Sequence, residues 1–384
     1  MCRTSPVRRV ALEAAWAWLD SQALAVSQEK AAVGPEVVGR VLACDVQSEA
    51  DLPATSISVV DGFAVRADDI LGASDYNLIH LSLGLSDGDE AGRAVAVVSG
   101  RPIPARFDTV LPVDCVERSE GAIEVASAVP RGNGVVRAGQ AAASGSRLLS
   151  AGARITPADI MLLREAGCAA VTLKGQSKIA VISFGSKGGA DTSGATLVQL
   201  IGRDGALASE IASSSTALCL ERCSDADLVV VVGRSGWGDD DVAEGLICQH
   251  GSLDHHGLAL RPCNSVGFGH LGGVPLLLLP GDPLSAWVAY ELLVARLVRR
   301  WSSLPSRLAY GSEPRALSRK IASPVGTADW VPLLYEGDGR VTPVPIPAAC
   351  PVSVLGRAQA FALIPAASEG VASGDSITIH PLKS

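Results

Sequence analysis

Three consecutive aspartates, 239–241, follow an apolar run at 228–232 and a glycine-rich loop at 233–238. Capping of a helix explains one aspartate well and a second tolerably, because carboxylates are favoured near the positive end of the helix dipole. Capping explains three in a row poorly, since only the N-cap side chain folds back onto the free amides. The pattern therefore favours a ligand or metal role for these carboxylates.

A second loop with potential chemistry lies at 184–194 and contains the sequence GSKGG. Backbone amides at a helix start, with Lys187 as a point charge, are typical of a phosphate-binding loop. The spacing is neither that of a Walker A motif nor GxGxxG. A flexible surface loop explains the glycines equally well, so both interpretations stay open.

The elements that position these loops alternate between strand and helix over 176–304. Residues 178–183, 228–232 and 275–279 are apolar enough to form buried parallel strands, and 258–262 is expected to add a further strand to this domain. After the last buried strand, the residues Pro280-Gly281-Asp282-Pro283 provide a turn, an N-cap and an N1 proline for a helix to about residue 300. This order predicts a doubly wound α/β domain, whose ligands bind at the strand carboxyl ends.

The rest of the chain divides by composition into three parts. Segments 1–48 and 147–175 show helical spacing and are expected to form one discontinuous helical and linker domain. Segment 49–146 has short apolar runs between turn residues, which predicts a β-rich insert. Segment 305–384 has short strands and many prolines and is expected to form a small β-barrel. The predicted fold class is therefore multi-domain α/β plus β.

One further carboxylate, Asp61, precedes Gly62 between two apolar segments of the β-rich insert. The Asp-Gly pair is typical of a hairpin turn. The alternative is an exposed loop carboxylate directed at a site elsewhere. From the residues alone, the turn is the favoured interpretation.

Composition excludes several classes of protein. The 384 residues carry a net charge of −8, which argues against a nucleic acid as the main partner. No apolar run approaches the ~20 residues of a membrane span, and acidic residues at 13 and 20 do not fit a signal peptide, so we expect a cytoplasmic protein. Nine scattered cysteines without a CxxC pair favour reduced thiols over zinc binding. The histidines within 250–256 are expected to lie in a solvated turn.

Taken in order, these motifs resemble those of the molybdopterin molybdenumtransferase family, the MoeA and gephyrin E-domain type. The segment DLPATSISVVDGFAVR is similar to the family's DxPPFDNSAMDGYAVR, and VSGRPIPARFDTVLPVD is similar to its TGAPLPxGADAVVPxE. DTSGATL resembles DSNGYML, and the central stretch from 227 to 241 resembles ADLVITSGGVSVGDYD. LPGDPLSA is close to LPGNPVSA. The resemblance covers essentially the whole chain.

The resemblance implies insertion of molybdenum from molybdate into adenylylated molybdopterin (molybdopterin-AMP), with a divalent cation, usually Mg2+. It implies an elongated homodimer in which the central α/β domain binds the pterin nucleotide and the partner's β insert covers the cleft. Asp61 would be the acid of this lid, and Asp241 and Asp239 would be catalytic acids of the central loop and its metal ligands. The cofactor-binding positions implied or suggested by the loops are Ser99, Gly185, Ser186, Lys187, Asp191, Ser193, Gly233, Arg234, Ser235, Gly236, Gly238, Arg261, Pro280, Gly281 and Pro283.

Several charged positions depart from the family pattern. The family's TGDEL is replaced by FGSKG, which removes two carboxylates and adds Lys187. A hard cation prefers carboxylate oxygens, so this change should weaken metal or molybdate handling there. Two family lysines are replaced by Arg261 and Asn264, and Arg234 and Trp237 enter a loop of small residues. Arg261 can still bind phosphate, with a different geometry.

Three hypotheses follow from these departures. The first is a working, divergent molybdenumtransferase. The second is a catalytically impaired paralogue that binds molybdopterin or its mature cofactor, or docks on a molybdoenzyme. The third is a structural partner that forms a mixed dimer with an active family member. Loss of the TGDE carboxylates argues against the first, and retention of the aspartates at 239–241 argues partly for it.

Overall fold

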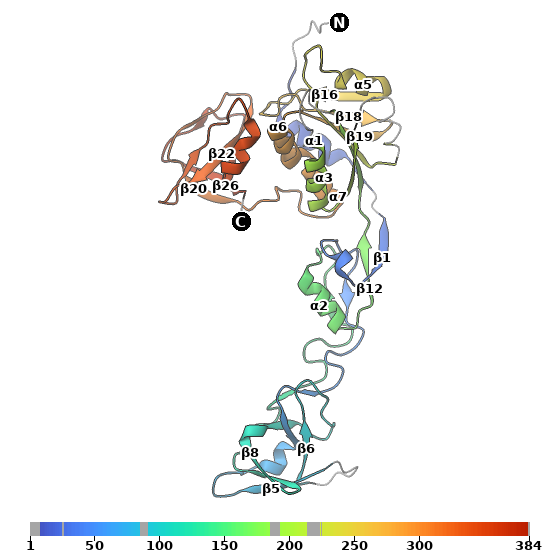
Figure 1. Cartoon of the computed structure of the whole chain (residues 1–384), viewed down its shortest axis with the longest axis vertical. Helices are drawn as coiled ribbons and strands as arrows, with labels where there is room; N and C mark the ends of the chain where they lie inside the picture. Colours follow the sequence, from blue (N-terminus) through green and yellow to red (C-terminus); the bar gives the residue numbers. More distant parts are fainter. Residues whose placement is uncertain are drawn as a thin grey trace. The chain divides into compact units, whose positions relative to one another are not determined.

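The computed structural model describes residues 8–24, 27–84, 91–184, 193–212, 223 and 225–382. The chain divides into two compact units. The smaller unit comprises residues 30–173, and the larger one combines residues 1–29 with 174–384 (Figure 1). Within the described ranges, the helices are all too short or too polar to cross a membrane.

The larger unit is built around a six-stranded sheet with the order β14-β13-β15-β19-β18-β16. The first four strands run parallel, whereas β18 and β16 are antiparallel to their neighbours. The strands are β13 (Lys178–Ser183), β14 (Leu207–Ala212), β15 (Leu228–Val232), β16 (Gly251–His256), β18 (Gly267–Leu271) and β19 (Val274–Leu279). The sheet has the parallel core that the strand and helix alternation predicts.

Both faces of this sheet are covered, which explains why its central strands are apolar throughout. Val230 and Val232 of β15 belong to one core cluster, and Val229 and Val231 belong to the opposite one. The first cluster includes residues of α1, α3, α6 and α7, and the second includes residues of α5. The helices are α1 (Leu12–Ser21), α3 (Ser193–Arg203), α5 (Ala243–His250), α6 (Pro283–Ala289) and α7 (Ala295–Trp301).

The helix predicted after β19 begins as expected and then changes its winding. Asp282 is the N-cap, and its Oδ1 accepts a hydrogen bond of 3.0 Å from the amide of Ser285, with Pro283 at the first helical position. Between α6 and α7 the chain forms one π-helical segment, η4 (Tyr290–Val294), which the spacing of apolar residues did not predict. Such segments often occur at functional or polar sites.

A second sheet of the larger unit has the order β17-β22-β24-β26-β20, with β23 paired to β22. The segment predicted as a strand at 258–262 does form β17, but it pairs with β22 of this sheet and not with the α/β sheet, which corrects the prediction. Closure into a barrel stays a prediction. The remaining elements are β17 (Leu260–Arg261), β20 (Glu313–Ala316), β21 (Ile321–Ala322), β22 (Ala328–Tyr335), β23 (Val341–Pro343), η5 (Pro351–Ser353), α8 (Val354–Arg357), β24 (Ala360–Ile364), β25 (Gly370–Val371) and β26 (Ser376–Pro381).

The smaller unit contains a six-stranded sheet with the order β7-β4-β6-β5-β9-β8. It also contains α2 (Pro157–Glu165), which begins with a capping box between Thr156 and Asp159. Its sheet strands are β4 (Gly62–Val65), β5 (Ile79–Leu83), β6 (Arg93–Val97), β7 (Thr109–Pro112), β8 (Val116–Ser119) and β9 (Ala122–Val125). Short pairs are formed by β1 (Gln28–Ala32) with β12 (Ala170–Lys174), β2 (Val46–Gln47) with β11 (Arg147–Leu149), and β3 (Ile57–Ser58) with β10 (Val135–Val136). Single turns of 3-10 helix are η1 (Pro35–Val37), η2 (Ala67–Ile70) and η3 (Val113–Cys115).

Helix α1 packs in the larger unit, whereas the prediction grouped 1–48 with 147–175. Leu12, Ala15 and Leu19 are buried in the same cluster as the α/β sheet. The helix was predicted correctly from its spacing, but periodicity does not identify the surface against which an apolar face packs. Among the described residues of 1–48, the expected helical spacing otherwise yields only η1.

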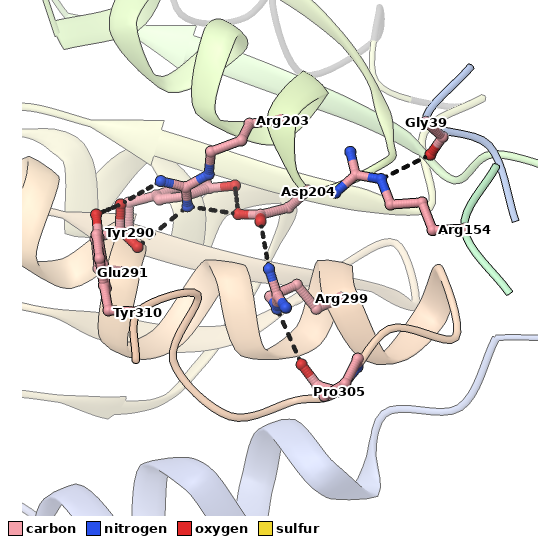
Figure 2. A network of polar contacts seen from close by, with 9 residues as sticks. All are labelled: Gly39, Arg154, Arg203, Asp204, Tyr290, Glu291, Arg299, Pro305 and Tyr310. Carbon is pink, nitrogen blue, oxygen red and sulfur yellow. Dashed lines mark hydrogen bonds and ion pairs between the residues drawn. The ribbon is translucent and has the colours of Figure 1, made fainter. Parts of the chain in front are cut away.

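A buried polar network ties α3, η4, α7 and the segment that leads to the second sheet (Figure 2). Asp204 is fully buried and accepts hydrogen bonds from the Tyr290 hydroxyl at 2.8 Å and from Arg299 Nη1 at 2.9 Å. Arg203 contacts both Asp204 and Glu291 at 2.8 Å. Burial first, and the charge of Asp204 second, raise the pKa of Tyr290, so its hydroxyl stays a neutral donor.

We expect Asp204→Ala to lower the free energy of unfolding by about 3–5 kcal/mol, because Arg299 and Tyr290 lose their buried acceptor. Chemical denaturation followed by tryptophan emission measures this change. Asp338→Ala is the matched control, since Asp338 pairs with Arg340 on the surface and its loss should leave the midpoint unchanged. Equal midpoints for both variants would contradict a structural role of the network.

Candidate active site at the carboxyl edge of the sheet

The carboxyl ends of three parallel strands lie at the same level of the α/β sheet. The register pairs Ser183 with Val232 and Val232 with Leu279. The ladder continues into the loops, because the amide of Phe184 donates to Val232 O at 2.9 Å and that of Gly233 donates to Leu279 O at 3.1 Å. The loops that start at 184, 233 and 280 therefore leave one edge of the sheet, where open α/β sheets bind ligands.

Backbone approaches backbone so closely here that glycine is required at two positions. A Cβ added to Gly233 would lie 2.6 Å from Phe184 O, and the φ of Gly233 is +97°, which also disfavours a side chain. A Cβ added to Gly281 would lie 3.0 Å from the Cα of Gly233. Arg234, next in the loop, has a positive φ of 47° that most side chains avoid.

The acidic segment precedes α5 and does not begin it, which corrects the predicted helix start. The N-cap of α5 is Val242, without a side-chain capping bond. Asp241 folds back onto the glycine loop, where its Oδ2 accepts a hydrogen bond of 2.9 Å from the amide of Gly238. Asp239 is exposed beside it. Capping of α5 therefore does not account for these aspartates.

The metal role predicted for Asp239 and Asp241 stays a prediction. Among the residues that the structure describes, no group of three or more histidine, cysteine, aspartate or glutamate side chains could hold a metal ion. Mg2+, however, is usually bound by only one or two carboxylates together with substrate phosphates. One exposed and one half-buried carboxylate beside a glycine loop fit that kind of site.

His256 was not among the predicted site residues, and the structure corrects the solvated turn expected around it. The segment forms strand β16, and the His256 side chain is only 4% exposed. Its Nε2 lies 2.8 Å from Ser235 O and its Nδ1 lies 3.0 Å from Glu244 Oε2. The ring centroids of His256 and Trp237 lie 5.4 Å apart, and the two rings are tilted by 33°. Its hydrogen-bond partners are 12 and 21 residues away, so no local pattern identifies it.

A cavity of about 550 Å³ lies beside the paired strands β17 and β22 of the second sheet. Its lining includes Arg261, Asn264, Lys320, Asp329 and Trp330. Arg261 Nε donates to Asp329 Oδ1 at 3.2 Å, and Nη2 makes a second contact with the same carboxylate. The predicted phosphate ligand is thus already paired, and the lining retains two cationic side chains against one carboxylate.

Hydrogen bonds join this cavity wall to the glycine loop and to the turn after β19. The hydroxyls of Ser235 and Ser265 lie 2.9 Å apart. Ser285 Oγ donates to Pro262 O at 3.2 Å, and Cys263 Sγ donates to Ser285 O at 3.2 Å. Burial, and then the charge of Asp282, raise the pKa of Cys263, so its thiol stays protonated. Hydrogen bonds therefore link the glycine loop and α6 to the segment 262–265, of which Pro262 and Asn264 line the cavity.

In the smaller unit, two predicted residues lie side by side. The amide of Ser99 donates to Asp61 Oδ1 at 2.8 Å, and the amide of Val113 donates to Asp61 O at 3.1 Å. Asp61 lies just before β4 and Ser99 lies just after β6, and both residues are exposed. Asp61 therefore stabilises a turn, as the hairpin-turn interpretation requires, while its charged group remains accessible to a ligand.

Four predicted residues, Gly185, Ser186, Lys187 and Asp191, lie outside the described residues. Ser193 is buried at the first position of α3. Its neighbour Gly194 lies close to the end of β13, since a Cβ added there would be 3.1 Å from the Cβ of Ser183. The start of α3 therefore lies at the same edge of the sheet as the three loops.

Several known proteins are similar to this chain. The family described as MoeA N-terminal region (domain I and II) matches residues 10–167. Molybdopterin molybdenumtransferase 2 of Mycobacterium tuberculosis is 26% identical, over 90% of this chain and 93% of its own. Molybdopterin molybdenumtransferase of Bacillus subtilis is 25% identical, over 88% and 86%. A crystal structure of the molybdopterin biosynthesis MoeA protein from Pyrococcus horikoshii is 26% identical, with a TM-score of 0.78 over 98% of this chain and 100% of that one.

We expect Gly233→Ala to lower the free energy of unfolding by at least about 1 kcal/mol, because the added methyl group meets Phe184 O and the positive φ is retained. Gly245→Ala is the control. It adds a methyl group within α5 where nothing lies within 4 Å, and it should stabilise the chain by about 0.5–1 kcal/mol. Thermal unfolding of both variants measures the difference, and a neutral Gly233→Ala would mean that the loops separate easily.

Proposed function

We propose that the chain is a member of the MoeA family and acts as a molybdopterin molybdenumtransferase of molybdenum cofactor biosynthesis. The observation that supports this most is the common level of three strand ends, whose loops carry the family-like motifs and connect to a cationic cavity. The substrates in this proposal are molybdopterin, in its adenylylated form, and molybdate. The working form is a cytoplasmic homodimer.

The anionic parts of the substrates find two kinds of donor at this edge. Backbone amides of the glycine loop stabilise phosphate oxygens without a charged side chain. Lys320, together with the donors of Arg261 that Asp329 leaves available, contributes positive charge in the cavity. A tetrahedral oxyanion such as molybdate, or a pterin phosphate, fits a cavity of about 550 Å³ in size and in charge.

The carboxylates supply the opposite charge. Asp239 and Asp241 would hold Mg2+, which neutralises phosphate charge when it is bound. Asp241 also fixes the loop through Gly238, so its position is set before a ligand arrives. Asp61, supplied by the partner subunit, would act as a lid acid that orients the substrate over the cavity. The chemistry then depends on positioning of charged groups and on exclusion of water.

A reaction of the purified chain with adenylylated molybdopterin, molybdate and Mg2+ tests this function. We expect AMP release and molybdenum uptake in equal amounts, both reduced at least tenfold by Arg261→Gln, because a charged donor is lost from the cavity. Arg319→Gln, at an exposed position outside the cavity lining, is the control. Binding without release would instead support an impaired paralogue, and activity only after addition of an active relative would support a mixed dimer.

Asp61→Asn separates the lid role from the turn role. The asparagine oxygen can still accept the hydrogen bond from the Ser99 amide, so the thermal midpoint should not change. Loss of the charge should lower the turnover about a hundredfold, as loss of a positioning group does. Asp75→Asn, at an exposed position of the same unit, should leave the turnover unchanged. A fall in midpoint with unchanged turnover would return Asp61 to a purely structural role.

A further inference from the structure

The hydrogen bonds of His256 imply a definite number of protons. Its Nε2 contacts a backbone carbonyl and its Nδ1 contacts a carboxylate, at 2.8 Å and 3.0 Å. A carbonyl oxygen and an ionised carboxylate only accept hydrogen bonds, whereas a neutral imidazole has one donor. Both contacts are therefore made only if His256 is an imidazolium or if Glu244 is a carboxylic acid that donates to Nδ1. Either way, the pair holds one proton more than a neutral histidine and a carboxylate.

Loss of that proton breaks one of the two contacts. A lone pair of the ring would then face either Ser235 O or Glu244 Oε2, which is repulsive at these distances. The ring is almost fully buried, so water cannot easily replace the lost partner. Only one of the two hydrogen bonds, to Ser235 O of the glycine loop or to Glu244 in the first turn of α5, would then remain.

Two further side chains lie near the ring or the loop beside it. Trp237 stacks on one side, and the guanidinium of Arg9 lies 5.8 Å from the Trp237 ring centroid. From β18, the paired residue is Gly267, which carries no charge. In the described part of the site, the carboxylate of Asp241 is also directed at this loop, through Gly238.

The carbonyl of Ser235 fixes the direction of the next amide. In a trans peptide the C=O and the following N–H point in opposite directions. Because Ser235 O is directed at the buried His256, the amide N–H of Gly236 is directed away from it. Two contacts to His256, one through the carbonyl and one through the ring of Trp237, thereby set the orientation of the middle of the loop.

We propose that His256 is a positioning residue that, together with Glu244, holds the glycine loop 233–238 with its amides oriented toward an anionic ligand, and that the shared proton makes binding of a phosphate group weaken as the pH rises. This inference rests on the proposed function, in which the loop meets a phosphate. His256 does not contact the ligand. It acts through Ser235 and Trp237.

The variant Glu244→Gln distinguishes this role from simple packing. The glutamine amide can donate to Nδ1 of a neutral ring, while Nε2–H still donates to Ser235 O, so both contacts form without the extra proton. With AMP as the probe, the Kd of the unmodified chain should rise with pH, by up to about tenfold per unit when one proton is fully linked. Glu244→Gln should bind AMP with a Kd that changes much less over pH 6–9.

His255→Gln is the matched control, because the neighbouring histidine is exposed and should retain the full pH dependence. The ionisation of AMP itself is common to all variants and cancels in the ratio of their Kd values. Identical pH profiles for the unmodified chain and Glu244→Gln would overturn the proposal. So would AMP binding by His256→Ala that equals that of the unmodified chain at pH 6.

A measurement without ligand separates this inference from the function on which it rests. Nitrogen-15 NMR of the imidazoles, assigned by comparison with His256→Gln, should show protons on both ring nitrogens of His256 at pH 6 and the loss of one of them at high pH. If the shared proton resides on Glu244, the ring nitrogen signals should instead shift when Glu244 loses it. The difference in tryptophan emission between the unmodified chain and Trp237→Phe should follow the same transition. If these changes occur and AMP does not bind, the proposed ligand is wrong. If AMP binds and these changes are absent, the role of His256 is wrong.

Discussion

The backbone ladder between the ends of β13, β15 and β19 is the constraint on which the site depends. It places Ser183, Val232 and Leu279 in register and continues for one residue into the loops through the amides of Phe184 and Gly233. Since these strands are buried on both faces, a slip by two residues would expose apolar side chains at one end and bury loop residues at the other. The core therefore determines where three loops begin, and with them the place of any ligand.

Contacts within the loops convert this common level into one connected surface. Gly233 and Gly281 allow backbone contacts that no side chain would permit, and the Ser235–Ser265 pair extends the connection to the wall of the cavity. None of these contacts requires a charged group. The shape of the site is thus set by sterics and by backbone hydrogen bonds, whereas its charge is set by a small number of separate side chains.

This division explains what could be predicted from the sequence. The strands 228–232 and 275–279 and the helix capped by Asp282 were predicted because their signals are local: apolar runs, a capping residue and an N1 proline. The partner of β17, the position of α1 and the role of His256 depend on contacts between residues distant in the sequence, for which no local pattern exists. The Asp61–Ser99 contact was also invisible locally, although both residues were candidates from the resemblance.

The separation between a shape set by the backbone and a charge set by side chains also bears on the charged residues that the family resemblance implies and that this chain replaces. Arg261 stands where the resemblance implies a lysine, and its guanidinium is held by Asp329 in a bidentate geometry that a lysine could not form. Part of its positive charge is thereby used within the protein, and Asn264 contributes none. A site in which most donors were side chains would lose its ligand after such changes. In the proposed function, the amides of a glycine loop held in place by His256 and Asp241 would stabilise the anion, because backbone donors persist when side chains are exchanged. The retained glycines are therefore stronger support for ligand binding in this chain than the replaced lysines are against it.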